Sequence, residues 1–251
     1  HPSRANGCSA QHMRRQRTVR INTHLARAEE KAGIIKHGVP VVIGEANEEV
    51  AAVFRMKANS MKAPITFVDQ EAELSYPSAL LGGHQEKNAR TTLVALEQLE
   101  KKGWSVSRDA IQHGFQKVVR NTGFLGRWQV LSTHPLVIAD VAHNVDGMRV
   151  VKKMLTETPY SNLHMVFGIV NDKDPNPVLA EMPKKATYYF CKADIPRGLD
   201  ALELQVRAKA HGLAGDSYPS VQAAFVAART HAGQNDLVLI TGSVFVVAEV
   251  I

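Results

Sequence analysis

Hydrophobic positions divide the chain into short apolar runs and longer segments with helical spacing. Helical spacing, often with capping or turn residues at the ends, predicts helices at 26–35, 48–62, 86–102, 107–121, 147–155, 202–211 and 221–231. Apolar runs bounded by turn residues predict buried strands at 39–44, 64–68, 136–141, 163–170, 186–190 and 236–241. Because strands and helices alternate after residue 136, we expect an α/β fold with a mostly parallel, doubly wound sheet.

Composition is typical of a soluble globular protein. The 251 residues are 45% hydrophobic and 22% charged, which suffices for one large or two ordinary domains. Residues 1–23 are Arg-rich and polar without an apolar period, so this segment is poorly specified. No apolar run approaches the roughly 18 residues of a membrane span, so we expect a cytoplasmic protein without a membrane partner.

Charge and cysteine usage exclude several other classes. The formal charge is +6, but much of the excess comes from Arg14, Arg15 and nearby arginines in the amino-terminal segment. No helix-turn-helix or aromatic-rich RNA motif accompanies it, so we expect no nucleic-acid partner. Cys8 and Cys191 are far apart in sequence and have no metal-ligand spacing, so neither a disulfide framework nor a zinc site is indicated.

The strongest candidate site follows the predicted strand at 136–141. Ligands of open α/β sheets bind beyond the carboxyl ends of strands, and this strand ends in Asp140-Val141-Ala142-His143-Asn144. The Asp140 carboxylate can accept ribose hydroxyl protons, and His143 can contact a phosphate or a carboxylate. The alternative is structural: Asp140 and Asn144 would serve as turn and N-cap residues, with His143 incidental.

Three further positions carry weaker signals, each with a structural alternative. Arg127 can clamp phosphates, or it is a surface residue beside a packed tryptophan. The Gly82-Gly83-His84-Gln85 segment precedes a helix, so it can approach a base or sugar closely, or simply cap the helix. Lys31 reads by itself as a lysine complementing the dipole at a helix end.

Several short motifs gain meaning from their order and spacing. They are Glu30-Lys31-Ala32-Gly33, Gly38-Val39-Pro40, His84-Gln85 with Asn88, Gly126-Arg127-Trp128-Gln129, Asp140-Val141-Ala142-His143-Asn144, Phe167-Gly168, Pro196-Arg197 and Gly242-Ser243. Together they resemble the folylpolyglutamate synthase/dihydrofolate synthase family, relatives of the Mur peptide ligases. The resemblance runs from about residue 29 to residue 251.

The resemblance implies an ATP-dependent ligase and a two-domain organisation. In this family ATP phosphorylates the carboxylate of dihydropteroate or a folate, the amine of L-glutamate attacks the acyl phosphate, and Mg²⁺ offsets the phosphate charge. Residues 1–123 would be the remnant of a Mur-ligase-type ATP-binding domain. Residues 124–251 would form a Rossmann-like glutamate-ligase domain with a mostly parallel sheet.

The resemblance also assigns roles to individual residues. Asn88 matches an ATP-contacting asparagine, Arg127 a phosphate-contacting arginine, and Asp140 the ribose-binding aspartate. His143 matches a histidine associated with glutamate and catalysis. Lys31 matches a lysine that is carbamylated in the family, and it is the second candidate catalytic residue.

Two further positions complete the resemblance. Ser243 matches a position near bound glutamate. The family's metal-binding histidine would fall at Gln16, so we name no metal ligand.

The sequence also departs from the family. The G-x-x-x-x-G-K-[ST] phosphate loop of the family's amino-terminal half does not occur in these residues. We therefore expect a truncated chain without full activity that self-associates through apolar surface exposed by the truncation. The alternatives are a non-catalytic nucleotide-binding remnant and a Mur-type ligase acting on a peptidoglycan precursor.

Overall fold

The structure, a computed structural model, describes residues 25–172 and 174–251. The segment 1–23 and the position of Gln16 lie outside this range, as does Lys173. The chain forms two compact units: one contains the described residues up to Tyr76 together with 86–111, and the other contains 77–85 and 112–251. No helix in the described ranges is long and apolar enough to cross a membrane.

The first unit is a small α/β assembly. Residues 25–32 are helical, and strands β1 (Val41–Ile43) and β2 (Ile65–Phe67) pair in parallel. Helix α2 (Glu48–Ser60) connects these two strands and begins where the Asn47 side chain accepts the Val50 N–H. Most of helix α3 (Gly83–Glu100) also belongs to this unit. Its core consists of Ala32, Ile35, Ile43, Phe54, Ala58 and Ala63.

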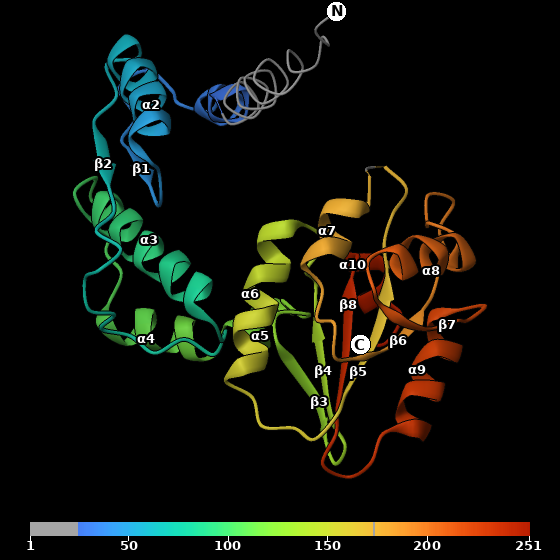
Figure 1. Ribbon diagram of the computed structural model, residues 1–251. Coiled ribbons are helices and arrows are strands. Elements are labelled where there is room, and N and C mark those ends of the chain that lie inside the picture. Colours follow the sequence, from blue (N-terminus) through green and yellow to red (C-terminus); the bar gives the residue numbers. More distant parts are fainter. Residues whose placement is uncertain (1–24, 173) are drawn as a thin grey trace, which may run out of the picture. The chain divides into compact units, whose positions relative to one another are not determined.

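The second unit is built on a six-stranded sheet with the order β3-β4-β8-β5-β6-β7 (Figure 1). The strands are β3 (Gln129–Thr133), β4 (Leu136–Asp140), β5 (Leu163–Gly168), β6 (Thr187–Phe190), β7 (Ala214–Ser217) and β8 (Leu237–Gly242). All neighbours pair in parallel except β3, which runs antiparallel to β4 at one edge. The last strand, β8, therefore inserts between β4 and β5.

Helices cover both faces of this sheet, as a buried parallel sheet requires. Helices α6 (Val145–Thr156), α7 (Asn176–Glu181) and α8 (Ala201–Ala210) pack on one core, and α9 (Val221–His231) and α10 (Val244–Ala248) pack on the other. Helices α4 (Arg108–Gln116) and α5 (Val118–Thr122) precede the sheet. The predicted α/β fold with a mostly parallel sheet is confirmed.

Several elements differ from the sequence prediction. The single helix predicted at 107–121 is two helices, because the backbone leaves the helical conformation at Lys117. Four short elements were not predicted: β3, α7, β7 and α10. Strand β7 has the sequence Ala-Gly-Asp-Ser, which carries no apolar signal, and α7 is a single six-residue segment containing a proline. These elements form because neighbouring strands and helices supply their hydrogen bonds and packing.

Gly215 tests how tightly β7 is paired with β6. A Cβ atom at this residue would lie 1.9 Å from the backbone oxygen of Tyr188, so Gly215→Ala should lower the free energy of unfolding by at least about 2 kcal/mol. Gly114→Ala is the matched control. Its added Cβ meets nothing within 4 Å inside α4, so it should stabilise the chain by up to about 1 kcal/mol. Urea unfolding of both variants measures the difference, and equal stability would contradict this packing.

Candidate functional site

The second unit brings polar residues together at the carboxyl ends of β4 and β8. Asp140 is the last residue of β4 and pairs in register with Thr241 of β8. Both are buried, with exposed fractions of 8% and 0%, in a place where apolar side chains would be expected. Ser243 follows β8 directly and is also buried. An ionisable group held here needs hydrogen-bond partners, and the structure supplies them.

The segment 126–129 supplies the partner of the Asp140 carboxylate. Gly126 has a φ of +72° and its carbonyl accepts the Val141 N–H at 3.0 Å, which ties the segment to the end of β4. The Gln129 side chain accepts the Gly126 N–H at 2.8 Å. With the turn fixed in this way, the backbone N–H of Trp128 donates to Asp140 Oδ2 at 2.8 Å.

Trp128 itself adopts an uncommon conformation. Its φ of +47° lies in the left-handed region that bulky residues rarely occupy, while its side chain is buried in the core beneath the sheet. Such a conformation persists only where the surrounding contacts determine it. The core packing of the indole and the hydrogen bond to Asp140 are two of these contacts.

Opposing influences act on Asp140. Burial raises the pKa of its carboxyl above the usual range, whereas the Trp128 N–H and the nearby Arg127 guanidinium act to lower it. Arg127 is half-buried, and its guanidinium lies over the Phe124 ring at 5.2 Å. A cation thus stands beside a largely desolvated carboxylate, an arrangement suited to binding a polar ligand that bears phosphate and hydroxyl groups.

His84 is the third titratable group of this site. Burial, and secondarily the charge of Arg127, lower the pKa of its imidazole, which favours the neutral ring. One ring nitrogen lies 3.0 Å from the Gln85 amide, and the buried Nδ1 has no hydrogen-bond partner in the part of the chain that the structure describes. Gly82, with a φ of +103°, packs against the same ring. His84 therefore offers a hydrogen-bonding atom without adding a positive charge.

The start of α6 settles the role of Asn144. Its side chain accepts the Gly147 N–H at 2.7 Å, so Asn144 is the N-cap residue that the structural alternative predicted. Asp140 has a different role, because its carboxylate accepts a backbone N–H from another segment. His143, between them, is exposed. The structural alternative thus holds for Asn144, while the ligand-binding role of Asp140 stays a prediction.

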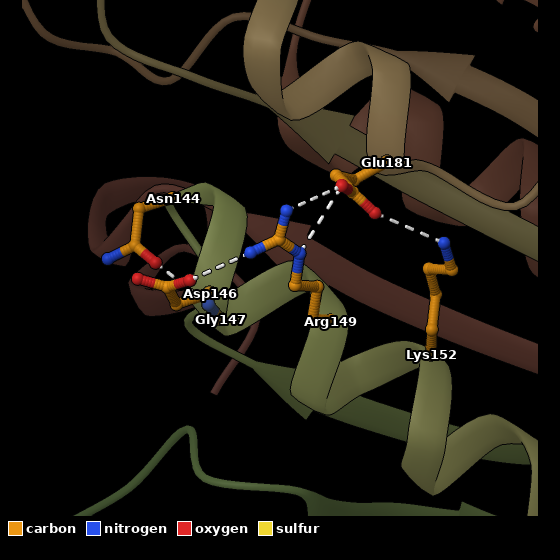
Figure 2. Close-up of polar contacts among 6 residues, drawn as sticks. All are labelled: Asn144, Asp146, Gly147, Arg149, Lys152 and Glu181. Carbon is orange, nitrogen blue, oxygen red and sulfur yellow. Dashed lines mark hydrogen bonds and ion pairs between the residues drawn. The ribbon is translucent and has the colours of Figure 1, made fainter. Parts of the chain in front are cut away.

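A surface ion-pair cluster links α6 to α7 (Figure 2). Glu181 at the end of α7 accepts hydrogen bonds from Arg149 at 3.0 Å and from Lys152 at 3.2 Å. Arg149 also reaches Asp146 in the first turn of α6 at 3.3 Å. These bonds from Arg149 and Lys152 lower the pKa of the Glu181 carboxyl. The cluster holds α7, and with it the end of the loop after β5, against the helix that follows His143.

Ser243 is held by two backbone contacts. Its N–H donates to the Gly168 carbonyl at 2.9 Å, and its hydroxyl accepts the Val246 N–H at 3.2 Å as the N-cap of α10. Gly242 must be glycine, because its φ is +113° and a Cβ would lie 2.1 Å from the Gly168 oxygen. This close approach brings the ends of β5 and β8 together beside Ser243.

The predicted site residues fall into two groups. Arg127, Asp140, His143 and Ser243 all lie at the carboxyl edge of the sheet in the second unit. Lys31 and Asn88 belong to the first unit, where both are exposed, Lys31 in the helical segment 25–32 and Asn88 in α3. The second unit therefore places four of the six predicted residues at one edge.

In the described residues the Asp140 site forms no metal centre, and a cavity of the second unit lies apart from it, past the ends of β5 and β6. In residues 25–172 and 174–251, no group of three or more His, Cys, Asp or Glu side chains could hold a metal ion. A cavity of about 670 Å³ lies elsewhere in the second unit, between the loop after β5 and α8, and is lined by residues such as Asn171, Lys192 and Arg207. Its charges are mixed, and it shares no lining residue with the Asp140 site.

Some residues of the site could not be found from the sequence. The backbone N–H of Trp128 carries no side-chain signal, and its alignment with Asp140 depends on the antiparallel pairing of β3, which was not predicted. His84 and Gln85 were noted as a motif, but their sequence gave no sign that His84 would lie near Arg127. Thr241 read only as the last residue of an apolar strand.

The chain is similar to a known ligase domain and to several folate enzymes. The family model of the Mur ligase glutamate ligase domain matches residues 126–244. A probable bifunctional folylpolyglutamate synthase/dihydropteroate synthase of Haloferax volcanii is 33% identical over 217 residues, covering 84% of this chain and 25% of that protein. The crystal structure of a bifunctional folylpolyglutamate synthase/dihydrofolate synthase from Yersinia pestis, complexed with AMPPNP and a Mn ion, matches with a TM-score of 0.72 and 27% identity, covering 89% of this chain and 55% of that one.

A further solved structure adds a second type of ligand. A bifunctional folylpolyglutamate synthase/dihydrofolate synthase with Mn, AMPPNP and L-glutamate bound matches with a TM-score of 0.71 and 28% identity, covering 89% of this chain and 55% of that one. The chain thus spans a quarter of the Haloferax relative and about half of the solved proteins.

Asp140 gives a stability test of the site. A carboxyl whose folded-state pKa is raised destabilises the folded chain at pH values above that pKa, and this penalty is lost as the pH falls through it. Asp140→Asn should therefore unfold with a larger free energy than the unmodified chain at neutral pH, and the difference should shrink on acidification. Urea unfolding across pH measures this, with Asp109→Asn, an exposed carboxylate on α4, as the control. A difference that grows on acidification would contradict the assignment.

Proposed function

Because the chain belongs to the folylpolyglutamate synthase/dihydrofolate synthase family and matches part of its members, we propose that it acts in the ATP-dependent addition of L-glutamate to dihydropteroate or folate. The observation that carries this proposal is the buried Asp140 carboxylate, fixed by the Trp128 N–H beside Arg127 at the carboxyl edge of a parallel sheet. Nucleotides bind at such edges in open α/β folds.

The proposal assigns a domain to each part of the chain. Residues 124–251 are the glutamate-ligase domain, which is supported by the family-model match at 126–244. Residues 1–123 are assigned to the ATP-binding domain.

Asp140 and Arg127 are proposed to hold the nucleotide. The carboxylate of Asp140 has one oxygen engaged by the Trp128 N–H, and its other oxygen is suited to accept a ribose hydroxyl. The planar guanidinium of Arg127 can donate two parallel hydrogen bonds to a phosphate, and the neutral imidazole of His84 beside it does not compete for that anion. Asn88 supplies a further contact to ATP from α3.

Three other residues are proposed to act where glutamate and the phosphates meet: His143, Ser243 and Lys31. His143 is exposed at the strand end beside Asp140, where it can orient the incoming glutamate. Ser243 contributes to the same region from the end of the neighbouring strand β8. Lys31, when carbamylated, would present a carboxylate to the phosphate region.

The chemistry these residues support is mainly positioning. ATP phosphorylates the substrate carboxylate, and the glutamate amine displaces phosphate to form the amide, so the protein must align three reactants and exclude water. We propose Mg²⁺ as the accompanying ion, since two related structures hold Mn with AMPPNP. Within the described ranges no cluster of acidic and histidine side chains fits a metal ion, so we assign it no ligand and derive no step through it.

An assay of ATP-dependent phosphate release tests the proposal. With dihydropteroate or reduced folate, L-glutamate and Mg²⁺, we expect release that is lost in Arg127→Ala, because the phosphates lose their bidentate partner. Removing one such charged contact typically costs about 2–3 kcal/mol, or roughly a hundredfold in rate. Arg120→Ala, which removes an exposed arginine of α5, is the matched control and should retain the rate.

The outcome separates the candidate functions. Release that persists in Arg127→Ala would contradict the proposed phosphate contact. Nucleotide binding without any release would instead favour a non-catalytic nucleotide-binding remnant.

A further inference from the structure

Thr241 carries a buried hydroxyl that the proposed function leaves unused. Its side chain is fully buried in the central strand β8, and its Oγ1 has no hydrogen-bond partner among the residues that the structure places. Buried hydroxyls are nearly always paired, because an unpaired one loses its hydrogen bonds to water without replacement. Valine has the same shape and would fill this position without that loss. The hydroxyl at Thr241 therefore requires an explanation.

The register of the sheet places this hydroxyl next to the proposed ribose-binding carboxylate. Thr241 pairs with Asp140 of β4 on one side and with Phe167 of β5 on the other, and both pairings are parallel and in register. Side chains of register partners point to the same face of a sheet, and neighbouring strands lie about 4.8 Å apart. Two residues earlier, Ile138 and Leu239 share one core, which confirms that this face is common to both strands.

The two side chains have complementary hydrogen-bonding capacity. A threonine hydroxyl is a donor, and an ionised carboxylate accepts at both oxygens. The structure records one hydrogen bond to the Asp140 carboxylate, from the Trp128 N–H to Oδ2. The Thr241 hydroxyl is thus a donor without a partner in the described residues, and the neighbouring Asp140 carboxylate can accept further hydrogen bonds. Rotation about the χ1 torsion of Thr241 between staggered positions changes the direction in which its hydroxyl points.

We propose that Thr241 is a positioning residue of the nucleotide site, whose hydroxyl donates to the Asp140 carboxylate when that carboxylate binds a ribose. The inference rests on the proposed function, because it assumes that Asp140 contacts a nucleotide. The Trp128 N–H and the Thr241 hydroxyl would then hold the carboxylate from two sides, one from the turn before β3 and one from β8. Fixing the carboxylate in this way aims its remaining acceptor capacity at the ligand.

The pH dependence of binding distinguishes this role from a merely structural one. Donors to an ionised carboxylate favour the charged form, so loss of the hydroxyl should shift the titration of Asp140 in the nucleotide complex to higher pH. The charge that acts on Asp140 is that of Arg127, which also acts on His84, and a change at Thr241 replaces neither residue. A shift in the acidic limb of nucleotide binding would therefore report on the contact to Asp140.

The test uses the full chain and AMPPNP, with affinity measured by calorimetry across pH. We expect Thr241→Val to bind AMPPNP about tenfold more weakly and to lose binding at a higher pH on acidification, because one hydrogen bond to a charged group is removed. Thr241→Ser keeps the hydroxyl and should restore both the affinity and the pH profile. Urea unfolding should show Thr241→Val to be at least as stable as the unmodified chain, since it removes an unpaired buried hydroxyl.

The outcomes separate this inference from the function on which it rests. Absence of AMPPNP binding by the unmodified chain, or unchanged binding by Asp140→Ala, contradicts the proposed nucleotide site and the inference with it. If that site is established, equal affinity in Thr241→Val overturns the inference alone. Weaker binding with an unshifted acidic limb also overturns it, because the hydroxyl would then act on the ligand and not through Asp140. If Thr241→Val does not fold, Thr241→Ala gives the same comparison against Thr241→Ser.

Discussion

The hydrogen bond from the Trp128 N–H to the buried Asp140 carboxylate determines the arrangement of the candidate site. A carboxylate at the end of a buried strand is costly to ionise, and this bond, with the Arg127 guanidinium nearby, compensates part of that cost. The same bond requires the unusual backbone conformation of Trp128, which in turn places Arg127 at the edge of the sheet. The conformation of the turn at Trp128 therefore determines both how the Asp140 carboxylate is held and where the Arg127 charge lies.

Topology supplies the remainder of the site. Because β8 inserts between β4 and β5, the last strand in the sequence lies beside the first parallel strand of the sheet. That order brings Thr241 next to Asp140 and Ser243 to the same edge of the sheet, although about a hundred residues separate them from Asp140 along the chain. The close approach of Gly168 and Gly242 allows the strand ends to meet there. Residues that hold a ligand from two strands can only be assembled in this way once the whole sheet has formed.

The sequence predicted features that depend on local pattern and missed features that depend on contacts between distant residues. Apolar runs and helical spacing predicted the buried strands and most helices, because those elements are set by local pattern. The motif after β4 drew attention to Asp140, which the structure shows to be buried, and Asn144 proved to be a helix cap. Strand β7 was missed because its residues have little intrinsic strand preference, and β3 was missed because its two apolar residues, Val130 and Leu131, make too short an apolar run. The Trp128 N–H and the Thr241 hydroxyl were missed because their importance arises from contacts distant in sequence.

The most direct test of the account is an NMR titration of the ¹⁵N-labelled chain with AMPPNP. The account predicts that the backbone N–H of Trp128 shifts on binding, together with that of Gly126 in the same turn, because the carboxylate that accepts the Trp128 N–H would contact the ribose. Residues around the cavity lined by Lys192 and Arg207 should not shift. Shifts confined to that cavity, with the Trp128 signal unchanged, would contradict the central claim that nucleotide binds at the carboxyl edge beside Asp140.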